Sequence, residues 1–91
     1  MSLERRHYDP SSPMDIRVRF GRNVRALRDA ADLSQDEFAD RVGVHRTYMS
    51  GIERGVRAPT IIVVEKIART LGVDPGALFA SDLNLERHRA K

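Results

Sequence analysis

Residues 34–55 read SQDEFADRVGVHRTYMSGIERG, and this stretch decides the fold. Its first half predicts a short helix, because Ser34 and Glu37 have the spacing of a capping box. In such a box the serine hydroxyl and the glutamate carboxylate each accept a hydrogen bond from a free backbone N–H group. Gly43 is expected to end this helix, because glycine adopts the left-handed conformation without a steric clash.

The second half of the stretch predicts another short helix, which begins at about Arg46 and is stopped by Gly55. Met49 and Ile52 are expected to face inward from this helix. Ala39 supplies the small side chain that two crossing helices need where they touch. Two short helices joined by a tight turn, with an apolar pair beneath the second, are typical of a helix-turn-helix.

The chain resembles the Cro/repressor-type (Xre-type) helix-turn-helix DNA-binding family over about residues 16–79. The resemblance implies an all-α fold, a compact five-helix lambda-repressor-like domain whose helices two and three form the helix-turn-helix. It also implies double-stranded DNA as the partner. The matching segments are Leu33–Gln35, Phe38–Ala39, Val42–Val44, Arg46–Ser50, Ile52–Gly55 and Pro59.

Hydrophobic spacing predicts the other three helices. The first is expected to be capped by Ser12, with Asp15 completing a capping box. The fourth is expected to follow a Thr60 cap and to end at Gly72, and a short fifth helix is expected after Asp74. The expected core residues are Ile16, Phe20, Val24, Leu27 and Ala31 in the first helix, Ile61, Val64, Ile67, Ala68 and Leu71 in the fourth, and Leu78 and Phe79 in the fifth.

The composition fits one small domain of 91 residues with an ordinary hydrophobic content of 41%. The net charge of +3 is mildly basic, which is compatible with a nucleic-acid partner. We expect a flexible N-terminal tail at 1–12, the DNA-binding domain at 13–80, and a C-terminal extension at 81–91 that is a candidate dimer arm. The first residues lack the apolar segment of a signal peptide, and no run is long enough to span a membrane, so we expect a cytoplasmic protein.

The outward side of the second helix of the motif is expected to contact DNA bases. Arg46 is the strongest candidate, because its guanidinium fork matches O6 and N7 of guanine, and a phosphate contact or a surface charge is the alternative. Thr47 is suited to a thymine methyl group. Gly51 indicates either a very close approach to the groove or one missing contact. The expected base-contacting set is Arg46, Thr47, Ser50 and Gly51.

Phosphate contacts are expected from five residues around this helix. Gln35 lies at a helix N-terminus, where backbone N–H groups favour an anion, and the resemblance implies a phosphate contact for it. His45 stands where a serine or threonine cap is usual, so we expect a weak cap; a phosphate donor and a partly exposed spacer both remain open. Tyr48 fits either packing or a phosphate contact. Arg54 and Arg57 complete the set.

The resemblance also implies a buried ion pair between Arg28 and Glu53, which would tie the first helix to the recognition helix. Its expected role is structural, because a charge buried without its partner is costly.

We expect a homodimer, because helix four carries apolar β-branched residues on its predicted outer side. The alternative is that these residues pack beneath the C-terminal extension. The expected dimer interface comprises Ile62, Val63, Phe79, Leu83 and Leu85.

The leading hypothesis is a sequence-specific DNA-binding transcriptional regulator, a homodimeric repressor acting on a palindromic operator. The alternative is an antitoxin-like or other protein-interaction module of the same fold, whose DNA binding is autoregulatory. No cofactor, metal or catalytic site is expected. The chain has no cysteine, its three histidines lack ligand spacing, and the acidic residues at 36, 37 and 40 are explained by capping and the helix dipole. We therefore do not expect an enzyme.

Overall fold

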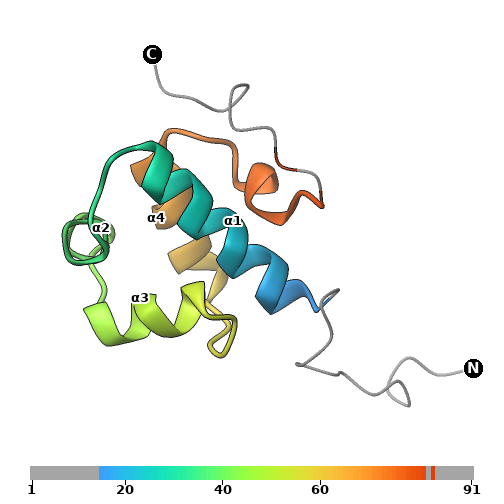
Figure 1. The fold of residues 1–91 in the computed structure, drawn as a ribbon, viewed down its shortest axis with the longest axis horizontal. Coiled ribbons are helices and arrows are strands. Elements are labelled where there is room, and N and C mark those ends of the chain that lie inside the picture. The colour runs from blue at the N-terminus through green and yellow to red at the C-terminus, as the bar shows by residue number, and fades with distance from the viewer. Residues whose placement is uncertain (1–14, 82, 84–91) are drawn as a thin grey trace, which may run out of the picture.

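The structure, a computed structural model, describes residues 15–81 and 83, and within these residues the fold is all-α (Figure 1). The all-α prediction is confirmed for this part of the chain, which holds four α-helices, and a short 3-10 helix stands where the short fifth helix was predicted. The elements are α1 (Ile16–Ala30), α2 (Gln35–Val42), α3 (Arg46–Glu53), α4 (Ile61–Leu71) and the 3-10 helix η2 (Pro75–Phe79).

Helix α1 runs through the middle of the molecule (Figure 1). It packs against α3, α4 and η2, whereas α2 packs against α3 and α4. Helices α2 and α3 are joined by a three-residue turn at 43–45 and form the helix-turn-helix. The connection is short because Gly43 takes a φ of 89°, the left-handed conformation predicted for it. Val44 is half-buried in the turn and packs against the core.

The predicted capping box of α2 is confirmed. The Ser34 hydroxyl accepts a 3.0 Å hydrogen bond from the Glu37 backbone N–H, and the Glu37 carboxylate accepts one of 3.1 Å from the Ser34 N–H. These hydrogen bonds lower the pKa of the Glu37 carboxyl below its ordinary value, the backbone donor of Ser34 having the larger effect. The charged form of Glu37 is therefore the form that stabilises the start of α2.

The contribution of Glu37 to stability is expected to depend on pH. Because its pKa is lower in the folded than in the unfolded chain, the contribution is present above the unfolded value of about 4.3 and is lost as the pH falls through the folded value. The difference in free energy of unfolding between wild type and Glu37→Gln should therefore shrink between neutral pH and about pH 3. Urea denaturation at both pH values measures it. A difference that stays constant would contradict the prediction.

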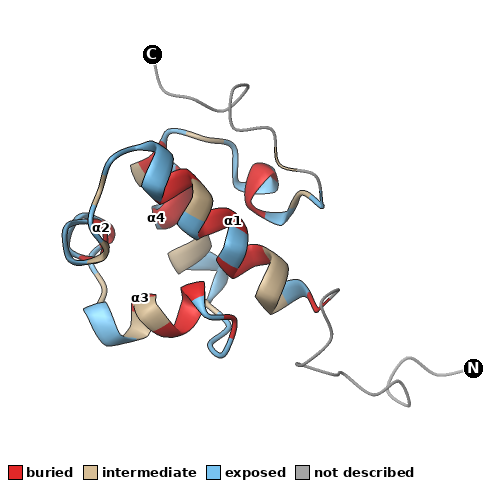
Figure 2. Cartoon of the chain, viewed as in Figure 1, coloured by how far each residue is buried: buried red, intermediate tan, exposed pale blue. Residues whose placement is uncertain are grey.

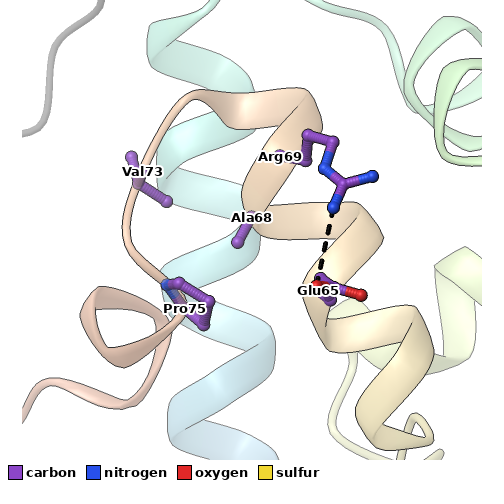
Figure 3. Close-up of a pocket in the computed structure, with 5 residues that line it drawn as sticks. All are labelled: Glu65, Ala68, Arg69, Val73 and Pro75. Atoms are coloured by element: carbon purple, nitrogen blue, oxygen red, sulfur yellow. Dashed lines mark ion pairs between the residues drawn. The ribbon is translucent and has the colours of Figure 1, made fainter.

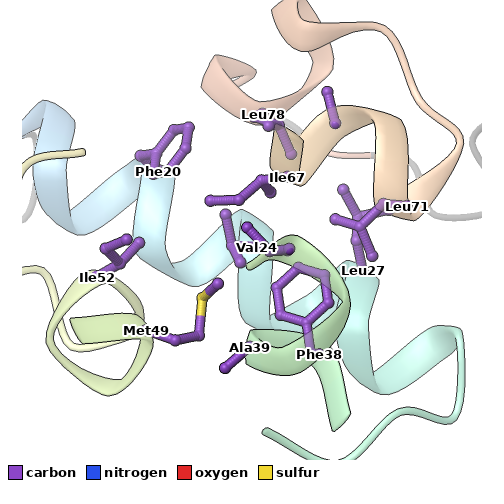
Figure 4. Close-up of a cluster of buried hydrophobic side chains, with 12 residues drawn as sticks. Phe20, Val24, Leu27, Phe38, Ala39, Met49, Ile52, Ile67, Leu71 and Leu78 are labelled. Atoms are coloured by element: carbon purple, nitrogen blue, oxygen red, sulfur yellow. The ribbon is translucent and has the colours of Figure 1, made fainter. Parts of the chain in front are cut away.

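The hydrophobic core lies between α1, α2, α3 and α4 and is closed by η2 (Figure 4). Each of the four α-helices and η2 contributes at least one completely buried side chain, and buried residues occur in every one of these elements (Figure 2). The largest fully buried side chains are Val24, Phe38, Met49, Ile52, Ile67 and Leu78.

Four predicted core residues lie at the surface, so these predictions are wrong. Ile16 and Ile61 are 40% and 84% exposed, because each is the first residue of its helix and projects beyond the part that packs on other described elements. Ala31 is the exposed cap that follows α1. Phe79 is 39% exposed, but one face of its ring packs on Phe20, with the ring centroids 5.0 Å apart.

Helix α1 begins later than predicted. Asp15 is its cap, accepting a 2.8 Å hydrogen bond from the Arg17 backbone N–H, so α1 starts at Ile16. The predicted Ser12 cap and the proposed tail at 1–12 lie outside the described residues. The earlier start was wrong because an aspartate accepts the first-turn N–H as well as a serine does.

A buried asparagine fastens η2 to α1. The Asn23 side-chain amide donates two hydrogen bonds, of 3.0 Å to the Leu78 carbonyl and 2.8 Å to the Ala80 carbonyl. Asn23 is only 8% exposed, so both of its amide hydrogens are satisfied inside the protein. The C-terminal part of the domain is therefore held to the same helix that supports α3.

Candidate nucleic-acid interface

Helix α3 is exposed at its N-terminal end and becomes buried along its C-terminal half (Figure 2). Met49 and Ile52 are completely buried, as predicted, and hold the helix against the core. Arg46 and Thr47 are exposed at its N-terminal end, and Arg54 is exposed just after its last residue. Both expected base readers of the first turn are therefore accessible to a partner outside the domain.

The backbone of α1 touches the backbone of α3 at Gly21. A Cβ atom at this position would overlap the Ile52 carbonyl oxygen and lie 2.7 Å from that of Glu53. Only glycine allows this close approach. Gly21 was not predicted as a contact residue, although a glycine within a helical pattern often signals such a packing contact.

A buried network joins α1, α2 and α3. The Arg28 guanidinium donates to the Glu53 carboxylate through Nε at 2.7 Å and NH2 at 3.0 Å, and through NH1 to the Leu33 carbonyl at 2.8 Å. The expected ion pair is thus present, and its hydrogen bonds raise the pKa of Arg28. Gln35 joins the network by donating from Nε2 to Glu53 Oε1 at 3.0 Å. Part of the Gln35 amide is therefore used inside the protein.

The N-terminus of α3 is capped by His45. Its Nδ1 accepts a 3.0 Å hydrogen bond from the Thr47 backbone N–H. The cap is therefore present, because an imidazole nitrogen without a hydrogen can accept this bond, and its expected weakness stays a prediction. The other ring nitrogen, Nε2, then carries the hydrogen and can act as a donor.

Arg46 forms an ion pair with Asp36 of α2, with 3.0 Å between Nε and Oδ1. Further along α3, the Ser50 hydroxyl accepts a 3.3 Å hydrogen bond from Arg54 Nε. Tyr48 is half-buried and packs against the core. The exposed face of the motif therefore presents two arginines, each held by a neighbouring side chain.

The prediction that Gly51 faces outward is wrong. Gly51 is buried, and a Cβ atom there would overlap Cγ of Arg57, whose aliphatic carbons lie against this glycine. The Gly51 carbonyl also accepts hydrogen bonds from the backbone N–H groups of Val56 and Arg57, at 3.0 and 3.1 Å. The glycine therefore serves the packing of the loop after α3, which residue spacing alone does not reveal.

The residues expected at a dimer interface differ in their surroundings. Ile62 is 59% exposed, whereas Val63 and Leu83 are half-buried and pack against the core, so Val63 was wrongly expected on the outer side of α4. Phe79 is partly covered by Phe20. Leu85 lies outside the described residues.

A surface pocket of about 240 Å³ lies between α4 and η2 (Figure 3). The ion pair between Glu65 and Arg69 of α4, 3.5 Å apart, stands at its edge (Figure 3). None of the residues lining the pocket belongs to α2 or α3, so it is separate from the exposed face of the motif. The lining residues are Glu65, Ala68, Arg69, Val73 and Pro75.

Residues 15–81 and 83 were compared with the requirements of a metal site and of a membrane-spanning helix, and they meet neither. No group of three or more histidine, aspartate or glutamate side chains there is arranged to hold a metal ion. In the same part of the chain, no helix combines the length and the apolar character needed to cross a membrane.

Known proteins that are similar to this chain also contain a helix-turn-helix. The helix-turn-helix family model (HTH_3) matches residues 24–78. The control protein C.MunI of a Mycoplasma species is 42% identical over 73 residues, covering 79% of this chain and 97% of that protein. The control protein C.BamHI of Bacillus amyloliquefaciens is 44% identical over 66 residues, covering 71% and 82%.

Among solved structures, the restriction-modification controller protein C.AhdI from Aeromonas hydrophila superposes with a TM-score of 0.67 at 40% identity. The match covers 69% of this chain and 96% of that one. The chain therefore belongs to the helix-turn-helix family and is a DNA-binding transcriptional regulator.

Proposed function

We propose that this regulator is a homodimeric repressor that binds a palindromic operator, with α3 of each copy in the major groove. The observation that carries the proposal is the arrangement of α3. Met49 and Ile52 anchor the helix, while Arg46 and Thr47 are exposed in its first turn. The first turn of a recognition helix is the part that reaches base edges.

In this proposal Arg46, Thr47 and Ser50 contact bases, and Gly51, which is buried, does not. The surrounding residues contact phosphates, which position a protein on DNA. Gln35 retains one amide hydrogen and its backbone N–H for this purpose. The proposed phosphate contacts are Gln35, His45 through Nε2, Tyr48, Arg54 and Arg57.

A second copy of the chain is proposed to bind at α4 and η2. Ile62, Glu65 and Arg69 share one face of α4 by helical spacing. Ile62 is 59% exposed at one end of this face, and the pocket beside η2 lies at the other. A dimer formed here would leave both α3 helices free to enter successive major grooves, about 34 Å apart.

The similarity to control proteins over nearly their whole length supports a more specific role. We propose that the chain regulates genes of a restriction-modification system and acts in the cytoplasm.

The test is selection of bound sequences by the purified protein from a random DNA pool, repeated over a salt series. The expected result is a palindrome with two half-sites whose centres are one helical turn apart. Binding that falls steeply with salt and enriches no motif would mean that only phosphates are contacted, and would overturn the proposal.

Replacing Arg46 with alanine is expected to remove most of the preference for one base pair in each half-site. A bidentate arginine–guanine contact contributes about 1–3 kcal/mol of discrimination. Titration of the selected duplex and of a duplex altered at that base pair measures the loss. Arg25→Ala on α1, which also removes one exposed arginine, should leave the preference unchanged. If Arg46→Ala kept the wild-type preference for that base pair, Arg46 would not be a base-contacting residue.

A further inference from the structure

The ion pair between Asp36 and Arg46 connects the first turn of α2 to the first residue of α3. Its two side chains are 74% and 66% exposed. Exposed ion pairs of this kind add little to stability, because water screens the charges and two flexible side chains must be ordered. Helix α2 also begins with a complete capping box that does not involve Asp36. The pair therefore contributes little to the stability of the fold. Its main effect is expected on the exposed residues that are proposed to contact DNA.

The atoms in contact decide what the pair leaves available. Asp36 Oδ1 approaches Nε of Arg46, at the side-chain end of the guanidinium fork. The shortest contact of the pair is at Nε, and within residues 15–81 and 83 neither NH1 nor NH2 of Arg46 donates a hydrogen bond. These two nitrogens form a fork that can meet O6 and N7 of a guanine. Asp36 therefore contacts the guanidinium at Nε, whereas the edge formed by NH1 and NH2 is the one that would contact guanine.

The negative charge of Asp36 also favours a contact of Arg46 with guanine over a contact with phosphate. A free arginine attracts any phosphate, whatever the sequence. A carboxylate 3.0 Å away offsets that attraction and itself repels phosphate. The edge of guanine has no net charge and offers two acceptors, so the repulsion acts on it much less. The pair thus disfavours non-specific binding more than it disfavours the guanine contact.

We propose that Asp36 is a positioning residue that sets sequence specificity, by holding Arg46 in the orientation that contacts guanine and by weakening its attraction to phosphate. The inference rests on the proposed function, because it needs α3 to contact bases. Asp36 itself is not expected to touch the DNA bases.

The experiment compares Asp36→Asn with Asp40→Asn. Asp40 lies one turn later on α2, is exposed, and has no ion pair with a described residue, so both variants remove one negative charge from the same helix. Each is titrated with a duplex carrying the selected half-sites and with one in which the guanine pair is replaced. The expected result is a ratio of the two affinities that falls at least about fivefold in Asp36→Asn and is unchanged in Asp40→Asn.

Two further readouts separate positioning from a structural role. In an Arg46→Ala background, Asp36→Asn and Asp40→Asn should change binding equally, because there is no guanidinium left to position. Asp36→Glu, which keeps the carboxylate, should retain most of the wild-type ratio. The single variants Asp36→Asn, Asp40→Asn, Asp36→Glu and Arg46→Ala should keep the circular dichroism spectrum of wild type, and Asp36→Asn should lower the unfolding temperature only slightly, through loss of one charge in the first turn of α2.

The outcomes distinguish this inference from the proposed function. If wild type prefers the guanine duplex and Asp36→Asn keeps the same ratio, the inference alone is overturned. A fall of equal size in Asp40→Asn would also overturn it, because a general charge effect would then explain the result. If wild type shows no preference at all, both the proposed function and the inference fail.

Discussion

Replacing Arg28 with alanine is expected to lower the free energy of unfolding by about 3–5 kcal/mol. The Glu53 carboxylate is almost completely buried and accepts two hydrogen bonds from Arg28, so the substitution leaves it charged without its main partner. Gln35 supplies one remaining hydrogen bond, which cannot neutralise the charge. The Leu33 carbonyl, which precedes the cap of α2, loses its donor as well. Urea denaturation of wild type and variant measures the change.

Two comparisons make this result specific. Arg25→Ala removes an exposed arginine from the same helix and should change the free energy of unfolding by less than about 0.5 kcal/mol. The double replacement Arg28→Met and Glu53→Leu should cost less than Arg28→Ala alone, because no buried charge is left. A loss below about 1 kcal/mol in Arg28→Ala would show that the network contributes little to stability.

Replacing Gly21 with alanine is expected to destabilise the domain by about 1–3 kcal/mol. In an unobstructed helix the same change would stabilise by roughly 1 kcal/mol, since alanine is the better helix former. Here the added methyl group would overlap the backbone carbonyls of Ile52 and Glu53, and backbone atoms cannot move aside without displacing α3. Gly21→Ala is therefore expected to destabilise the domain, whereas the same change stabilises an unobstructed helix. DNA binding should weaken as well, because α3 is displaced.

Gly51→Ala is the matched control, because it is also a glycine-to-alanine change within a helix. Its new methyl group would meet the side chain of Arg57, which has rotatable bonds and can turn away. We expect the free energy of unfolding of Gly51→Ala to stay within about 1 kcal/mol of wild type. Thermal unfolding of both variants is the measurement. A Gly21→Ala variant more stable than wild type would refute the close contact between α1 and α3.

The sequence was most informative where structure depends on neighbours along the chain. The cap at Ser34, the turn at Gly43, the cap at Thr60 and the end of α4 at Gly72 all follow from local hydrogen bonds and backbone conformation, and all are present. The inward direction of Met49 followed from helical spacing in the same way. The helix-turn-helix could therefore be predicted with its boundaries.

The sequence was less informative where structure depends on contacts between elements. Spacing assigned Ile61 to the core, but whether a first-turn residue is covered depends on what lies beyond the helix end. Spacing placed Gly51 on the outer side of its helix, as a close approach to the groove or a missing base contact, but the side chain of Arg57 lies against it. The ion pair between Asp36 and Arg46 joins α2 to α3, so the distance between its two side chains depends on the angle at which these helices cross.

The hydrogen bonds of Asn23 have a consequence for the DNA that a dimer would accept. They fix η2 to α1, and α1 also supports α3, so a partner bound at η2 sits at a set distance and angle from the recognition helix. Inserting one base pair between two half-sites turns one relative to the other by about 35° and moves it by about 3.4 Å. A rigid dimer cannot follow that rotation, so the spacer length of the operator should be as restricted as the bases of its half-sites.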